Sequence, residues 1–159
     1  MFKYSSCLSF CMSFDFKIGF KEKPKNLRGF LAEQKFKLDQ GLTETAREFE
    51  KRRKDKTQPK QTSYYLSDKK INTWIGIWYT DGMFGDENWP DFTSNPVKAQ
   101  LTISVHTYNR KNLLRQIAVA KALRDNFEAV LYDPQNGIVV AKHNEVDWRK
   151  SILDCVSKR

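Results

Sequence analysis

One acidic and aromatic segment, YTDGMFGDENWPDF at residues 79–92, has the residue types best suited to binding chemistry. It combines carboxylates with large apolar side chains and has no lysine or arginine: Asp81, Met83, Phe84, Asp86, Glu87, Trp89, Asp91 and Phe92. Aromatic side chains anchor protein interfaces, and carboxylates steer the encounter with a basic surface. We therefore interpret this segment as a partner-binding loop.

Two other interpretations of the same segment remain open. Carboxylate oxygens suit Ca²⁺ or Mg²⁺, but the spacing does not match the twelve-residue calcium loop, so the sequence predicts no metal and no cofactor. The second interpretation is an ordinary long connection whose aromatic side chains fold back onto the core.

A second candidate is the start of a helix in the segment YNRKNLLRQIAVAKALRDNF. Asn109 has the residue type of an N-cap, and Arg110 and Lys111 follow it, where the helix dipole favours anions over cations. Two cations beside free helical N–H groups predict an anion-binding site. The alternative is a pair of solvated side chains.

Motifs with a known catalytic mechanism are absent from the sequence. It contains no P-loop, no G-x-G-x-x-G, no G-x-S-x-G and no H-E-x-x-H. We therefore predict no catalytic residue and favour a protein that is not an enzyme. An enzyme of unrecognised type, with His106 as its base, stays an alternative.

The charge of the chain points to an anionic partner. The 159 residues carry a formal net charge of +9, with a dense basic tract at residues 51–60. Aromatic residues that follow this tract offer stacking surfaces for bases: Tyr64, Tyr65, Trp74 and Trp78. A nucleic-acid-binding or anion-binding domain is therefore the first alternative, and surplus lysine that only maintains solubility is the second.

The cysteines and the N-terminus bear on localisation. Cys7, Cys11 and Cys155 are odd in number and lack metal-ligand spacing, so they predict neither a disulfide framework nor a zinc site. Serines interrupt the apolar N-terminus, and no run of 18 apolar residues follows. The sequence predicts a cytoplasmic protein without a membrane segment. Met12 is an alternative start, which makes residues 1–11 an extension and residues 12–159 one domain.

The elements that position these candidates follow from hydrophobic periodicity. Alternation predicts a strand over residues 14–20, a hairpin that turns near residues 67–69, a strand over 101–105 and paired strands around the turn 133–137. Helical spacing predicts a helix from Leu27 to a Gly41 cap, a second helix with a Thr45/Glu48 capping box, the helix that contains Leu113, and a short helix from Glu145. Trp74, Gly76 and Trp78 share one strand face and form a shallow apolar shelf, or else pack beneath a neighbouring segment. The pattern indicates an α+β two-layer sandwich, a mainly antiparallel sheet with helices packed on one face, in a ferredoxin-like arrangement with additions.

Five segments carry a family resemblance: FDFKIGF, the two-part helical region, INTWIGIWYTDG, LTISVHTYN and VLYDPQNGIVV. In this order they resemble small cytoplasmic immunity proteins of bacterial polymorphic-toxin systems, over roughly residues 12–141. The resemblance implies a single domain that binds and neutralises a cognate toxin and has no catalytic residues. The predicted partner is therefore another protein, with nucleic acid as the alternative, and the sequence leaves the oligomeric state open.

Overall fold

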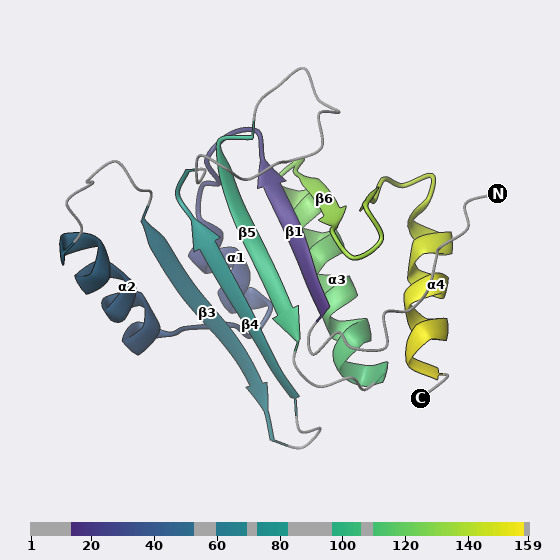
Figure 1. Ribbon diagram of the computed structural model, residues 1–159, viewed down its shortest axis with the longest axis horizontal. Helices are drawn as coiled ribbons and strands as arrows, with labels where there is room; N and C mark the ends of the chain where they lie inside the picture. The colour runs from purple at the N-terminus through teal and green to yellow at the C-terminus, as the bar shows by residue number, and fades with distance from the viewer. Residues whose placement is uncertain (1–13, 53–59, 70–72, 83–96, 106–109, 158–159) are drawn as a thin grey trace.

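The computed structural model describes residues 14–52, 60–69, 73–82, 97–105 and 110–157. Figure 1 shows a sheet with helices behind it and at its sides. Seven strands form the sheet: β1 (Phe14–Phe20), β2 (Lys37–Leu38), β3 (Gln61–Asp68), β4 (Thr73–Thr80), β5 (Ala99–Val105), β6 (Val130–Asp133) and β7 (Ile138–Val139). Four helices accompany them: α1 (Leu27–Glu33), α2 (Gln40–Arg52), α3 (Arg110–Asn126) and α4 (Glu145–Ser157).

The sheet is antiparallel throughout, in the order β2-β3-β4-β5-β1-β6-β7. Its central strands β6-β1-β5-β4 are the fourth, first, third and second strands of a βαββαβ unit, which is the ferredoxin-like order. Strands β2, β3 and β7 are the additions. The predicted α+β fold with a mainly antiparallel sheet is confirmed.

The core lies between the sheet and the helices. Every second residue of β1 faces it, so Phe16, Ile18 and Phe20 are fully buried. Three contacts place the helices on this same face. Gln116 of α3 donates to the carbonyl oxygens of Phe14 and Ile103, at 2.7 and 3.0 Å. Phe127, just after α3, packs edge-on against Phe20, with ring centroids 5.6 Å apart. Trp148 of α4 packs against Phe16 in the same way.

Helix α1 ends earlier than the sequence predicted. The N–H of Phe36 donates to the carbonyl of Leu31 at 2.9 Å, and the N–H of Lys35 donates to that of Ala32 at 3.0 Å. This is a Schellman motif, with Lys35 in the left-handed position at φ 72°. The chain then extends into β2, so the predicted helix from Leu27 to Gly41 is wrong beyond Glu33. Glycine normally marks this position, and a lysine there conceals the helix end from sequence analysis.

Replacing Lys35 with glycine is expected to raise the free energy of unfolding by about 0.5–1 kcal/mol. The left-handed backbone costs a residue with a Cβ roughly 1–2 kcal/mol, and the added chain freedom of glycine offsets roughly 0.5–1 kcal/mol of that gain. Urea unfolding of Lys35→Gly beside the wild type measures the difference. Exposed Lys25→Gly, outside this motif, should not be stabilised, and a destabilised Lys35→Gly would contradict the prediction.

Helix α2 also starts before the predicted capping box. Asp39 caps it, because its Oδ1 accepts the N–H of Leu42 at 3.1 Å. Thr45 instead lies inside the helix, where its hydroxyl donates to the carbonyl of Gly41 at 2.9 Å. The first turn of α2 also runs beside β3, since Thr43 Oγ1 accepts the N–H of Ser63 at 3.0 Å. Gly41 is therefore part of α2 and not a cap of α1.

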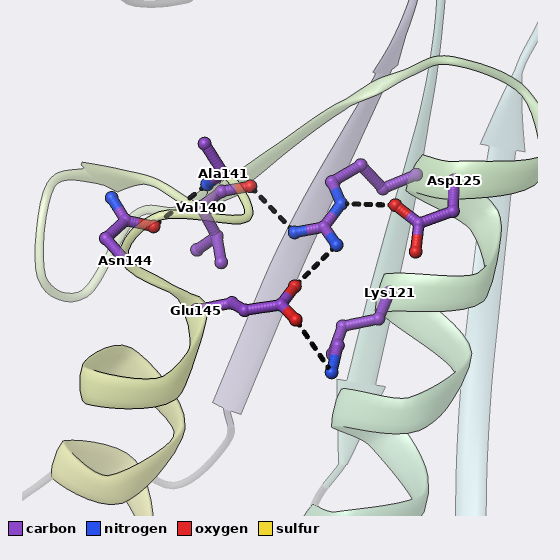
Figure 2. Close-up of polar contacts among 7 residues, drawn as sticks. Lys121, Asp125, Val140, Ala141, Asn144 and Glu145 are labelled. Atoms are coloured by element: carbon purple, nitrogen blue, oxygen red, sulfur yellow. Dashed lines mark hydrogen bonds and ion pairs between the residues drawn. The ribbon is translucent and has the colours of Figure 1, made fainter.

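Helices α3 and α4 are joined by a partly buried ion-pair network (Figure 2). Arg124, in the last turn of α3, has a side chain only 8% exposed. Its Nη2 lies 2.6 Å from Glu145 Oε2 in the first turn of α4, and its Nη1 donates to the carbonyl of Val140 at 3.1 Å. Lys121 and Asp125 extend the network, at 3.3 Å from Glu145 and 2.9 Å from Arg124. The network fixes the position of α4 against the core.

Two findings bear on the expected cellular setting. Cys155 in α4 is disulfide-bonded, which corrects the expectation that the cysteines form no disulfide. The spacing of three cysteines cannot reveal a pairing that folding brings about, and the other two cysteines lie outside the described residues. Among the helices of the described residues, none has the length and apolar character needed to cross a bilayer.

Candidate functional site

The sheet face opposite α1 and α3, which we call the front face, turns toward the viewer in Figure 1. Strand register assigns side chains to it. One row runs from Lys17 through Thr102 to Trp78, and the next row runs from Ser104 through Gly76 to Tyr65. The core residues of the same strands alternate with these. The front face is therefore polar, with aromatic side chains concentrated on β3 and β4.

Trp74, Gly76 and Trp78 form an aromatic shelf on this face. The two indole rings lie 6.2 Å apart between centroids and are tilted by 59°. Both rings reach over Gly76, because a Cβ built there would lie 2.6 Å from Trp74 Cη2 and 2.7 Å from Trp78 Cη2. Glycine is thus the residue that lets the two indoles close over the strand. Both tryptophans stay partly exposed, whereas Gly76 is buried.

Small polar side chains surround the aromatic shelf. Ser104 of β5 lies beside Gly76 of β4, and its hydroxyl donates to the carboxylate of Asp15 on β1. Ser63 and Thr80 are buried although they carry hydroxyl groups. Because Ser63, Thr80 and Ser104 are buried, they pack beside the shelf and do not form the solvent-accessible polar rim of an interface. The sequence predicted the shelf itself from the spacing of its three residues.

Gly76→Ala is expected to displace the two indoles with little loss of stability. A methyl group at 2.6–2.7 Å from their Cη2 atoms forces them apart, and these atoms are the far ends of side chains that can rotate. Near-ultraviolet circular dichroism should change, while the free energy of unfolding should fall by no more than about 1 kcal/mol. Gly41→Ala, where a Cβ meets only Asp39 Oδ1 at 3.8 Å, is the control. An unchanged spectrum for Gly76→Ala would contradict the shelf geometry.

Asp81, the first residue of the predicted partner-binding loop, lies just beyond β4. Its carboxylate accepts the Tyr79 hydroxyl at 3.3 Å and forms an ion pair with Lys23 at 3.2 Å. Burial raises the pKa of the Tyr79 phenol, and the Asp81 carboxylate raises it further, so the phenol keeps its proton at neutral pH. Asp81 therefore anchors the start of the loop to the fold. The other seven predicted residues lie outside the described residues: Met83, Phe84, Asp86, Glu87, Trp89, Asp91 and Phe92.

The predicted anion site at Arg110 and Lys111 coincides with the first two residues of α3. Both side chains are exposed, and the first turn of the helix holds no acidic residue. Asn109, the proposed N-cap, and His106 lie outside the part of the chain that the structure describes. Of the two cations, Lys111 lines a groove that also contains Lys35 and Arg115. The sequence pattern had connected neither Lys35 nor Arg115 with this site. Lys35 is distant along the chain, whereas the i, i+4 spacing of Lys111 and Arg115 on α3 is a signal that could have linked these two.

The basic tract is divided between described and undescribed residues. Helix α2 includes the first two residues of the basic tract and ends at Arg52. Lys60 lies directly before β3, and residues 53–59 lie outside the described residues. In the described ranges, no three His, Cys, Asp or Glu side chains gather to hold a metal ion.

Fold and front face together define an α+β sheet protein with an aromatic shelf. No protein-family model, curated protein or solved structure matches this chain. The functional assignment therefore depends on the chemistry of the residues themselves.

Proposed function

We propose that this protein is a non-catalytic protein-binding module of the immunity type, which binds and neutralises a cognate toxin. The observation that supports the proposal most directly is the aromatic shelf of Trp74, Gly76 and Trp78 on the front face. Tryptophan and tyrosine are enriched among the residues that dominate binding energy at protein interfaces. The resemblance of the sequence to immunity proteins suggests the class of partner.

The shelf and the predicted loop are continuous along the chain. Strand β4 carries both tryptophans and reaches Asp81 directly after Thr80, and the loop sequence continues from there. The ion pair with Lys23 and the Tyr79 hydrogen bond hold this junction in place. The carboxylates of Asp86 and Glu87 are therefore close in sequence to the shelf on which we propose that the partner binds. We propose that the toxin is nuclease-like and that these carboxylates meet its basic groove, where the phosphate groups of its nucleic-acid substrate would otherwise bind.

Affinity capture of the tagged protein from its native host tests the proposal. We expect one protein to be retained in a 1:1 ratio after nuclease treatment, and we expect Trp78→Ala to lose at least about tenfold in affinity for it. Val146→Ala, which removes an exposed side chain on α4, is the matched control. Retention that is equal for both variants would exclude the shelf as the interface.

The loop has a separate test. Charge reversal of Asp86 and Glu87 together is expected to weaken the complex, with the melting temperature unchanged. The wild-type complex should also lose affinity with added salt more steeply than the variant complex, because the variant lacks the attractive charges. Unchanged affinity would remove the loop from the interface and leave the shelf proposal standing.

Nucleic-acid binding is the second candidate function. Several RNA-binding and single-strand-binding domains stack bases on aromatic rings of a β-sheet face. Here Trp74 and Trp78 are partly exposed on such a face, and the chain has a net charge of +9. Recovery of nucleic acid in the capture experiment, or salt-sensitive binding of an oligonucleotide that Trp78→Ala abolishes, would favour this function over the first.

A further inference from the structure

A groove of about 660 Å³ lies on the helix side of the sheet, where the end of α1, the end of β3 and the first half of α3 meet. Seven residues line it: Lys35, Leu66, Ser67, Lys111, Leu114, Arg115 and Ala118. Its volume is within the range of small-molecule sites. Leu66 and Leu114 give it an apolar floor, and three of its lining residues are cations.

These cations have no acidic partner among the described residues. Among the residues that the structure describes, no carboxylate lines the groove, and none of Lys35, Lys111 and Arg115 forms an ion pair. Lys121 and Arg124, further along the same helix, are by contrast both paired with Glu145. Three cations lining one groove make it electropositive, and such a surface attracts an anion. The described lining residues supply no carboxylate that offsets this charge.

Lys35 lines the groove and has a backbone conformation that favours glycine. Its φ of 72° lies in the left-handed region, at the position of the Schellman motif where glycine is usual. Retaining a lysine there costs stability, and such local costs are typical of functional positions. The cation of Lys35 is the property that a glycine would lack.

Arg115 connects the two walls of the groove. Its Nη2 donates to the carbonyl of Gln34, the C-cap residue of α1, at 2.8 Å. This bond satisfies a carbonyl at the helix end and fixes the guanidinium beside Lys35. Because one of five N–H donors makes that bond, the guanidinium still has donors for a bound anion.

We propose that this groove binds a small molecule with a phosphate monoester group and an apolar body. A doubly charged phosphate matches a groove lined by three cations better than a single carboxylate does, and arginine binds phosphate oxygens with its fork of N–H donors. The apolar body would contact the floor formed by Leu66 and Leu114. Of the lining residues, Ser67 pairs with Trp74 of the aromatic shelf, and the others belong to the helix side of the sheet or to the helices and their ends. The proposal concerns a small molecule and not a protein partner, so its test is independent of the proposed function.

Titration of the isotope-labelled full chain with octyl phosphate, followed by two-dimensional NMR, tests the proposal. We expect the amide signals of Lys35, Ser67 and Lys111 to shift, with at least about tenfold higher affinity than for inorganic phosphate or for octanol. Equal affinity for inorganic phosphate would overturn the apolar part of the proposal, and equal affinity for octanol would overturn the anionic part. Shifts located elsewhere, or none, would overturn the site.

Variants separate binding from folding. Lys111→Gln and Lys35→Gly are each expected to weaken octyl phosphate binding by about tenfold, whereas Lys150→Gln, an exposed lysine of α4, should leave it unchanged. Lys35→Gly is the sharper variant, because we expect it to be more stable than the wild type. A loss of affinity in a stabilised protein cannot come from unfolding. Full affinity in both groove variants would overturn the proposal.

Discussion

Trp148→Ala is expected to lower the free energy of unfolding by about 3–5 kcal/mol, the usual cost of removing a fully buried tryptophan. Trp148 is 0% exposed and packs edge-on against Phe16, with ring centroids 5.1 Å apart. Its indole N–H also donates to the buried carboxylate of Asp133 at 2.9 Å. The change therefore leaves a cavity beneath β1 and removes one donor from a buried charge.

Urea unfolding measures this loss, and two further variants divide it. Trp148→Phe keeps most of the ring volume but removes the donor, and we expect it to cost about 1–2 kcal/mol. The loss stays modest because Asn136 still donates to the same oxygen of Asp133 at 2.7 Å. Arg149→Ala, at the next and exposed position, is the control. A loss below about 1 kcal/mol for Trp148→Ala would be inconsistent with full burial.

Arg124→Met is expected to cost about 2–3 kcal/mol of unfolding free energy. The change leaves the carbonyl of Val140 without its Arg124 donor and leaves Glu145 with Lys121 alone. Breaking a buried ion pair by removing one partner costs roughly 3–5 kcal/mol, but the Glu145 side chain is 20% exposed, so solvent reduces the penalty. Methionine retains the apolar part of the arginine side chain, which isolates the charge effect.

The same network predicts an acid-dependent loss of stability. The hydrogen bond from Arg124 lowers the pKa of Glu145 below its usual value of 4.5, and Lys121 lowers it further. A carboxylate with a lowered pKa stabilises the fold above its unfolded pKa, and this contribution disappears as the pH falls through the folded pKa. The stability difference between the wild type and Arg124→Met should therefore be largest near neutral pH and shrink below about pH 4.5. A difference that is constant from pH 7 to pH 3 would contradict the role of this charge pair.

The strands were the part of the fold that the sequence predicted best. In β1 the alternation of apolar and polar residues matches burial residue by residue at Phe16, Lys17 and Ile18, because a half-buried strand has a strict period of two. The turn after β6 was also predicted, since Asp133 accepts the N–H groups of Gln135 and Asn136 as turn chemistry requires.

Helix ends were predicted less well, for a local reason. Lys35 occupies a position where glycine would have signalled the end of α1, and Asp39 caps α2 six residues before Thr45, the start of the predicted box. The two candidate sites also differ in how well the sequence predicts them. The aromatic shelf could be predicted because its residues are neighbours on one strand. The groove could not, because Lys35 and Lys111 approach each other only through the packing of α1 and α3.

The sheet closes at both sides with very short strands, β2 and β7, each of two residues. Long, flat edge strands are templates for aggregation and for partners that add a strand to a sheet. Strand β2 pairs with β3 at Tyr64 and Tyr65, and the first turn of α2 occupies the N–H of Ser63 beyond β2. Short edge strands and a helix turn beside β3 are among the features by which native sheets limit edge-to-edge association.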